Sequence, residues 1–166
     1  MHKSGMDLMV DFVDRYDLRQ KRILDMGSMD INGSYRKLFP DGEYVGADVR
    51  SGKSVDVIVG SEEWDDLGTF DAVISGQTLE HVADIPQFLD DCDGKLLPGG
   101  LLCIIAPSAG PRHDVPIWVG HFSKEKMAGL VSDAGFDVIE AVTIKAHPFD
   151  DTRVIARKPE VVDEVD

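Results

Sequence analysis

The chain has 166 residues, of which 43% are apolar, and a formal net charge of −14 at pH 7. This length predicts one domain with a full hydrophobic core, and no apolar run approaches the ~20 residues that a membrane-spanning helix needs. A surface of this charge repels a phosphate backbone, which disfavours nucleic acid as a partner. At the N-terminus, Asp7, Asp11 and Asp14 interrupt the apolar positions, so no signal peptide is expected and the protein is predicted to be cytoplasmic.

Apolar periodicity and turn residues predict strands and helices that alternate along the chain. The first strand is expected to begin at residue 22, and further strands to cover residues 44–47, 55–59, 70–75, 101–106, 136–144 and 152–156. Helical segments are expected at residues 5–16, 35–39, 79–82, 86–92 and 124–134. The rest is expected as a polar segment (62–68), a turn (98–100), a long loop (108–122) and a flexible acidic tail (158–166). This alternation predicts a single α/β domain over residues 1–157, with an N-terminal helix within residues 1–20 and a parallel sheet covered by helices on both faces.

The most informative stretch is a short apolar strand that ends in an acid and then turns through glycine, Ile-Leu-Asp-Met-Gly-Ser at residues 23–28. A second strand follows, and it also ends in an acid, Asp48. In α/β folds such a pair prepares a site for an adenosine-containing cofactor. The glycine turn lets the ligand approach the backbone, and the second acid accepts hydrogen bonds from two ribose hydroxyls.

Four segments in family-like order make the chain resemble the class I S-adenosylmethionine-dependent methyltransferases, and within them the compact type 11 branch. They are residues 23–28, Val-Gly-Ala-Asp at 45–48, Phe-Asp-Ala-Val-Ile-Ser at 70–75 followed by Leu-Glu-His-Val, and Leu-Leu-Pro-Gly-Gly-Leu-Leu at 96–102. The resemblance implies a Rossmann-like, doubly wound sheet of seven mostly parallel strands, with an antiparallel strand from a C-terminal hairpin. It also implies S-adenosylmethionine as the cofactor and methyl transfer as the reaction.

The resemblance places the cofactor-binding residues after successive strands. Asp25 anchors the motif, Gly27 admits the ligand to the backbone, and Asp48 holds the ribose. The other expected cofactor residues are Ser28 and Met29 in the motif, Val49 against the adenine, Ser61 and Glu62 near the adenine amino group, and Ser75 and Gln77 at the methionine end. Each has an ordinary alternative, such as a turn glycine, a core valine or a solvated acid.

Met29 departs from the family pattern, because a second glycine usually stands at this position. Its side chain is expected to crowd the methionine portion of the cofactor. This departure keeps open a second hypothesis, a catalytically inactive methyltransferase-like protein that binds the cofactor or serves as a scaffold.

His81 and His113 are the expected catalytic residues. His81 follows the fourth strand, and an imidazole with an ordinary pKa near ~6.5 suits the removal of a proton from an attacking hydroxyl. The alternative is a histidine at a helix start that bonds to the backbone. Glu80, His81 and His113 would also suit a two-histidine, one-carboxylate metal site, so whether a metal binds is left open.

Three functions are therefore weighed. The first is methyl transfer to a small-molecule acceptor, with the hydroxyl of a sugar or secondary metabolite expected, by a monomer or homodimer. The second is the inactive homologue. The third, a nicotinamide-dependent enzyme, is disfavoured because the glycines do not follow the Gly-x-Gly-x-x-Gly spacing and because a C-terminal hairpin is expected.

Overall fold

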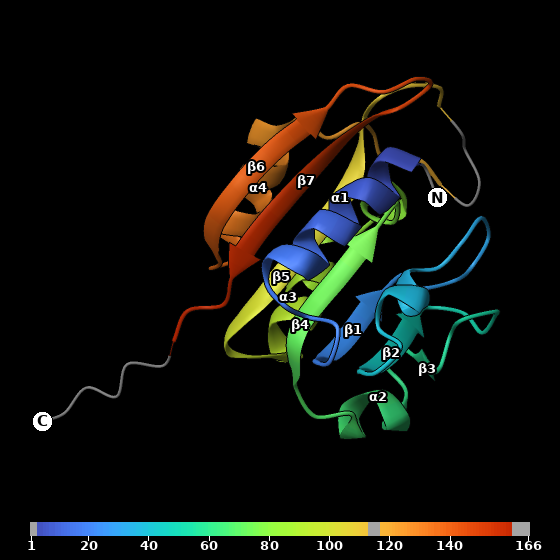
Figure 1. The fold of residues 1–166 in the computed structure, drawn as a ribbon, viewed down its shortest axis with the longest axis vertical. Coiled ribbons are helices and arrows are strands. Elements are labelled where there is room, and N and C mark those ends of the chain that lie inside the picture. Colours follow the sequence, from blue (N-terminus) through green and yellow to red (C-terminus); the bar gives the residue numbers. More distant parts are fainter. Residues whose placement is uncertain (1–2, 113–116, 161–166) are drawn as a thin grey trace, which may run out of the picture.

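The computed structural model describes residues 3–112 and 117–160. These residues form one seven-stranded sheet with helices on both faces (Figure 1). The strands are β1 (Arg22–Met26), β2 (Glu43–Asp48), β3 (Val57–Ile58), β4 (Phe70–Gly76), β5 (Leu96–Ala109), β6 (Asp137–Ile144) and β7 (Asp150–Arg157). The α-helices are α1 (Lys3–Arg15), α2 (Glu62–Asp66), α3 (Ile85–Gly94) and α4 (Lys124–Asp133), and two 3-10 helices are η1 (Tyr35–Leu38) and η2 (Leu79–His81).

The strand order is β3-β2-β1-β4-β5-β7-β6. The first five strands in this order are parallel, whereas β7 runs antiparallel to β5 and β6 antiparallel to β7. This confirms the predicted Rossmann-like sheet and its antiparallel C-terminal hairpin. Because the parallel strands end at the same edge of the sheet, the segments that follow β1, β2 and β4 come together there.

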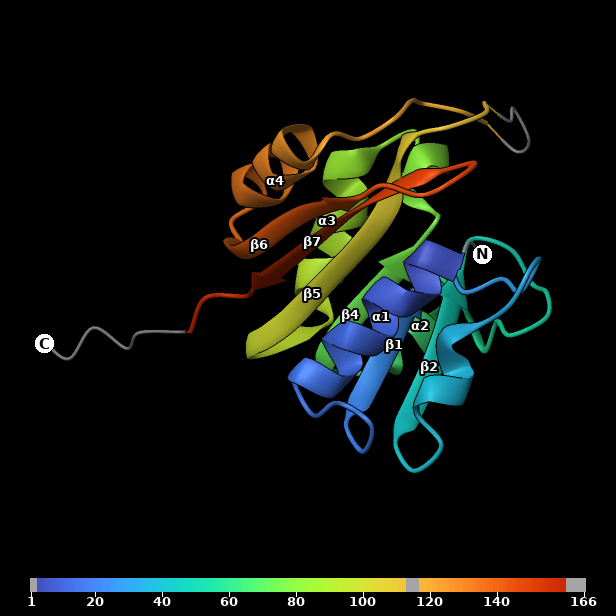
Figure 2. The ribbon, with the colours of Figure 1, turned by 45° about the horizontal axis from the view of Figure 1, so that its top comes forward.

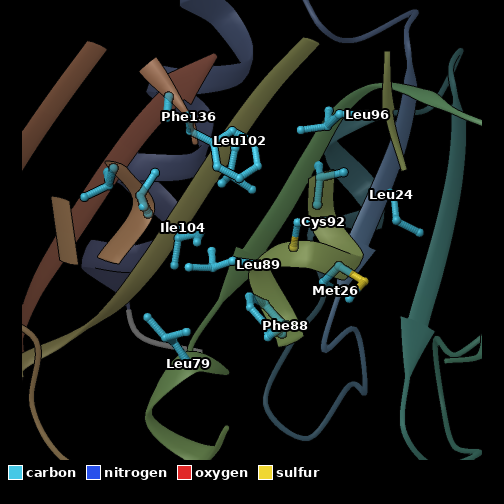
Figure 3. Packing of buried hydrophobic residues seen from close by; sticks show 14 of the residues in the cluster. Leu24, Met26, Leu79, Phe88, Leu89, Cys92, Leu96, Leu102, Ile104 and Phe136 are labelled. Atoms are coloured by element: carbon cyan, nitrogen blue, oxygen red, sulfur yellow. The ribbon is translucent and has the colours of Figure 1, made fainter. Parts of the chain in front are cut away.

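Helices bury both faces of the sheet, which explains why its central strands are apolar without alternation. On one face, the buried residues of α1 belong to one hydrophobic cluster with Ile23 of β1 and Ile74 of β4. Figures 1 and 2 show α1 lying across this face of the sheet. On the other face, α3 and α4 contribute buried residues to a second hydrophobic cluster, which also contains Leu24 and Leu102 (Figure 3). Neighbouring residues of one strand, such as Ile23 and Leu24, therefore serve opposite cores. Within the described residues, no helix is long and apolar enough to cross a membrane.

Three segments near the sheet differ from the sequence-based expectation. The third strand is shorter than predicted, since only Val57–Ile58 pair with β2. The polar segment at 62–68 contains helix α2, because the Ser61 hydroxyl accepts a hydrogen bond from Trp64 N at 3.2 Å and Trp64 is buried. The helix expected at 35–39 is the single 3-10 turn η1, capped by Ser34.

Strand β5 begins earlier than predicted, and the expected turn at 98–100 lies within it. Leu96 already pairs with Phe70, and a register shift before Ala72 accommodates the extra residues. Lys158 was expected in a flexible tail, but its backbone is hydrogen-bonded to this early part of β5. Lys158 N donates to Gly100 O at 2.9 Å, and Gly99 N donates to Lys158 O at 3.0 Å.

Candidate cofactor site

Two adjoining cavities lie at the edge of the sheet where β1, β2 and β4 end. Their volumes are about 390 Å³ and about 140 Å³. Both are lined by Gly27, Met29, Ile31 and Gln77, so these four residues mark the place where the cavities meet. The larger cavity extends along residues 48–50 and towards α3, and the smaller one extends from Asp25 to the turn at 32–35. The predicted glycine motif at residues 23–28 thus ends where the two cavities meet.

Gly27 forms the turn that closes β1. Its φ of +82° lies in the region that favours glycine, and a Cβ atom there would lie 2.2 Å from Oγ1 of Thr78. The amides of Gly27 and Ser28 both donate to Ala47 O, at 2.8 and 3.1 Å, which fixes the turn against β2. Thr78, which lines the larger cavity, was missed by the sequence analysis because nothing in its local sequence indicates this contact.

Asp25 is buried at the end of β1 and lines the smaller cavity. The hydroxyl of Tyr44 on β2 donates a hydrogen bond to its carboxylate. Burial raises the pKa of Asp25 to about 7, although the hydrogen bond from Tyr44 acts in the opposite direction. Burial and the neighbouring carboxylate also raise the pKa of Tyr44, so the phenol remains a donor.

Asp48 ends β2 half-buried and lines the larger cavity. Its Oδ2 accepts a hydrogen bond from Met29 N at 3.4 Å, and its Oδ1 accepts one from Arg50 N at 3.3 Å. Val49 lines the same cavity with 74% of its surface exposed. The structure therefore brings Asp48, Val49 and the glycine turn together, as the sequence predicts.

Met29 lines both cavities, and its side chain leans on the loop that follows β2. A Cβ atom built on Gly52 of that loop would lie 3.0 to 3.2 Å from three atoms of the Met29 side chain. Ser28 is fixed on the same loop, since its hydroxyl donates to Ser54 O at 3.0 Å. The residue that departs from the family pattern thus packs against a neighbouring loop.

Ser61, Glu62 and Ser75 are not among the described residues that line the two cavities. Ser61 caps α2, and Glu62 is exposed in the first turn of that helix. Ser75 is buried, and its hydroxyl donates to Met26 O at 2.7 Å, which joins β4 to β1. Their cofactor contacts remain predictions.

His81 lines the larger cavity at the end of η2. Its Nδ1 pairs with the carbonyl oxygen of Ile117, which fixes Nδ1 as the donor and leaves the basic lone pair on Nε2. His113 lies outside the described residues. Within 3–112 and 117–160, no group of three or more histidines, cysteines and acids is arranged to hold a metal ion.

Glu80 is a buried acid that the sequence analysis considered only as a metal ligand. It is 1% exposed, and its Oε2 has no hydrogen-bond partner among the described residues. Its Oε1 lies 3.9 Å from Nε2 of His81. Burial raises the pKa of Glu80 to about 7, and the nearby carboxylate of Asp151 acts in the same direction.

Comparison with known proteins finds similarity to methyltransferases. A family model described as a methyltransferase domain matches residues 43–104. A ubiquinone biosynthesis O-methyltransferase from Parvibaculum lavamentivorans is 28% identical over 113 residues, which are 56% of this chain and 44% of that protein. A probable S-adenosylmethionine-dependent methyltransferase from Mycolicibacterium smegmatis is 29% identical over 80 residues, which are 45% of this chain and 31% of that protein. The matches span less than half the length of these curated relatives.

Solved structures share the whole fold. The 1,6-didemethyltoxoflavin-N1-methyltransferase of Burkholderia thailandensis, solved with S-adenosylhomocysteine, has a TM-score of 0.74 at 16% identity and covers 95% of this chain and 80% of its own. An S-adenosylmethionine-dependent methyltransferase from Aquifex aeolicus has a TM-score of 0.66 at 20% identity and covers 89% of this chain and 87% of its own. The architecture is thus that of the class I methyltransferases. The family model and the curated relatives add a likeness in sequence to methyltransferases, among them the S-adenosylmethionine-dependent protein of Mycolicibacterium smegmatis.

Proposed function

We propose that this chain transfers a methyl group from S-adenosylmethionine to a small-molecule acceptor. The observation that carries the proposal is the pair of cavities that meet at Gly27 and Gln77, with one acid, Asp48, on the larger cavity and a second, Asp25, on the smaller. A cofactor made of an adenosine and an amino acid joined at sulfur has the same two-part shape. We assign the adenosine to the larger cavity and the amino-acid part to the smaller one.

The chemistry of the larger cavity suits an adenosine. The carboxylate of Asp48 offers two acceptor oxygens to a vicinal diol, and its present hydrogen bonds at 3.3 and 3.4 Å are long enough to be exchanged. Val49, Val59 and Phe88 supply apolar surface for a flat base. Gly27 brings only its backbone to the place where the two cavities meet.

The smaller cavity suits the amino-acid part. Its described lining contains no lysine, arginine or histidine, whereas Asp25 carries a buried carboxyl. The hydroxyl of Tyr35, a residue that lines this cavity, is buried and has no hydrogen-bond partner among the described residues. Buried polar atoms are ordinarily paired, so this wall is built for a ligand that donates hydrogen bonds, such as an ammonium group.

When bound, the cofactor would supply a methyl group already activated by a positive sulfur. The protein then has to hold donor and acceptor in line and, for a hydroxyl, remove a proton. We propose a hydroxyl acceptor with His81 as the base, because its Nδ1 contact with Ile117 directs the lone pair to Nε2. The curated relative named an O-methyltransferase supports this choice of atom. His113 remains a second candidate base.

Met29 supports one alternative, a homologue that binds the cofactor without turnover. The fold by itself does not decide between an active methyltransferase and an inactive homologue, since one structural neighbour is a [4+2]-cyclase, SpnF. Its TM-score is 0.64 at 16% identity, and the match covers 93% of this chain and 82% of that one. The acceptor test below separates the two functions.

Calorimetric titration and thermal denaturation with S-adenosylmethionine, S-adenosylhomocysteine and NAD test the proposal. The first two ligands should bind and, at 100 times the dissociation constant, stabilise the fold by about 2.7 kcal/mol. Stabilisation by NAD alone, or by none of the three, would contradict the proposal. Transfer of a labelled methyl group to a library of hydroxyl and amine acceptors then tests turnover, and binding without transfer would favour the inactive homologue.

A further inference from the structure

Gln77 has an unusual backbone conformation at the tip of β4. Its φ of +58° lies in the region that favours glycine, and its amide donates to Ile105 O of β5 at 2.8 Å. A side chain held in this region costs conformational free energy and is found most often where a site needs it. The conformation therefore suggests that the Gln77 side chain has a role at this edge of the sheet.

A buried acid from the other end of the sequence holds the Gln77 side chain. Its Nε2 donates to Oδ1 of Asp151 at 2.8 Å, and the hydroxyl of Ser4 in α1 donates to Oδ2 of the same carboxylate. Asp151 is fully buried at the start of β7. An amide nitrogen donates and a carboxyl oxygen accepts, so this bond turns the amide nitrogen of Gln77 towards Asp151. Its carbonyl oxygen must then point to the opposite side.

Gln77 lies where the two cavities meet. Of the four described residues that line both cavities, only Gln77 has a polar side chain, the others being Gly27, Met29 and Ile31. The Oε1 atom is buried and has no hydrogen-bond partner within the described part of the chain. A strained backbone, a fixed amide and an unsatisfied oxygen thus coincide at one point.

We propose that Asp151 is a positioning residue that acts through Gln77, because it fixes the amide so that Oε1 faces the sulfur of the methyl donor. This inference rests on the proposed function, in which the adenosine and amino-acid parts occupy the two cavities and their connecting sulfur lies at the junction. The partial negative charge of Oε1 attracts a positive sulfonium and its polarised methyl group. The demethylated product is neutral at sulfur and lacks this attraction.

The same contacts tie distant parts of the chain to the methyl group. Asp151 belongs to β7 and Ser4 to α1, whereas Gln77 directly follows the central strand β4. Figure 1 shows these elements, which come from the two ends and the middle of the chain. The hairpin therefore contributes to the site through one carboxylate, although Asp151 itself lines neither cavity.

The test compares the two forms of the cofactor. S-adenosylmethionine and S-adenosylhomocysteine are titrated calorimetrically into the unaltered protein and into Gln77→Leu, Asp151→Ala and Asp151→Asn. The ratio of the S-adenosylmethionine dissociation constant to that of S-adenosylhomocysteine should rise about tenfold in Gln77→Leu and Asp151→Ala. It should rise less in Asp151→Asn, about threefold, because the asparagine oxygen can still accept from Gln77 Nε2.

Asp150→Ala is the matched control. Asp150 precedes Asp151 on β7, and its carboxylate bonds Lys145 Nζ at 2.8 Å and Ala146 N at 3.0 Å. This variant weakens the same hairpin without touching the Gln77 amide, so its ratio should equal that of the unaltered protein.

An unchanged ratio in Gln77→Leu or in Asp151→Ala overturns the proposal, and so does an equal loss of both ligands, which would mean a structural role alone. If Asp151→Ala does not fold, Asp151→Asn decides for this residue. The combined variant Gln77→Leu/Asp151→Asn should show no more than the effect of Gln77→Leu, because both changes remove one interaction. If the unaltered protein binds neither ligand, the proposed function is contradicted. If it binds both and the ratio does not change in the variants, only the positioning role of Asp151 is contradicted.

Discussion

The two halves of the sheet are built in different ways. The half formed by β3, β2, β1 and β4 carries the two cavities of the site, and its turns contain residues with positive φ, such as Gly27 at +82° and Gln77 at +58°. The half formed by β5, β7 and β6 has longer strands and a buried arginine, Arg153, which bonds Asp11 Oδ2 at 2.7 Å and Glu140 Oε1 at 2.5 Å. The first half thus carries the proposed binding site, and the second carries a buried cation that is paired with two acids.

If this comparison holds, a change at Gly27 should weaken cofactor binding more than any other change considered. In Gly27→Ala the new Cβ would lie 2.2 Å from Thr78 Oγ1 and 2.7 Å from Thr78 Cβ, so the turn between the cavities must move. We expect affinity for S-adenosylmethionine, measured by calorimetry, to fall by about 100-fold or more.

Gly60→Ala provides the control for backbone strain alone. Gly60 has nearly the same φ, +83°, but a Cβ atom there would meet nothing within 4 Å. Both variants carry a similar strain, and only Gly27→Ala has the collision. Equal affinities in the two variants would show that the turn is not part of the site.

The second prediction separates the two acids assigned to the adenosine. Asp48→Ala should weaken cofactor binding by about 10- to 100-fold, because a carboxylate that bonds two hydroxyls is lost from the cavity wall. Glu62→Ala should change the affinity less than twofold, because Glu62 is exposed on α2 and is not among the residues that line the larger cavity. Exposed charged contacts contribute little free energy. A larger loss for Glu62→Ala would restore its predicted contact with the adenine.

The third prediction concerns the other half of the sheet. Arg153→Met should lower the free energy of unfolding in urea by about 2 kcal/mol, because it removes a buried cation from partners that are partly open to solvent. The affinity for S-adenosylmethionine should not change. Lys145→Met is the exposed control, and we expect no measurable loss of stability, since the Lys145 side chain is 82% exposed. Loss of cofactor affinity in Arg153→Met would break the division between the two halves.

Much of the first half was predictable because its signals are local. A parallel strand buried on both faces is an unbroken apolar run, and the acids at the ends of β1 and β2 follow such runs directly. Helix α2 was missed, although Ser61 followed by two glutamates is a recognisable helix start. The sequence predicts too short a β5, because Pro98 and the two glycines after it indicate a turn. The strand pairing of Leu96 with Phe70 and the backbone bonds to Lys158 show that the strand begins earlier.

The contacts that complete the site were not predictable, because they join residues that are far apart in sequence. The bond from Gln77 to Asp151 spans 74 positions, and the bond from Tyr44 to Asp25 crosses between two strands. Neither pair has a spacing that a sequence pattern detects. The positive φ of Gln77 is equally invisible, since a glutamine does not indicate the left-handed region as a glycine does.

The smallest expected effect lies within the first half, in the pH dependence that Asp25 gives to stability and to cofactor affinity. Burial raises its pKa to about 7, above the ~3.9 of an unfolded chain, so the folded state holds the proton more tightly. Stability should therefore fall as pH rises from about 4 to about 7, while affinity for the positively charged S-adenosylmethionine should rise as the carboxyl ionises near pH 7.

Asp25→Asn should flatten both profiles in part, measured by urea unfolding and calorimetry at pH 5 and pH 8. The remaining slope in stability is assigned to Glu80, whose pKa is also raised to about 7 by burial, and Glu80→Gln should reduce it. An Asp25→Asn variant with the original pH profile of affinity would remove the carboxyl of Asp25 from the binding of the cofactor's positive groups and leave the turn at Gly27 to define the smaller cavity.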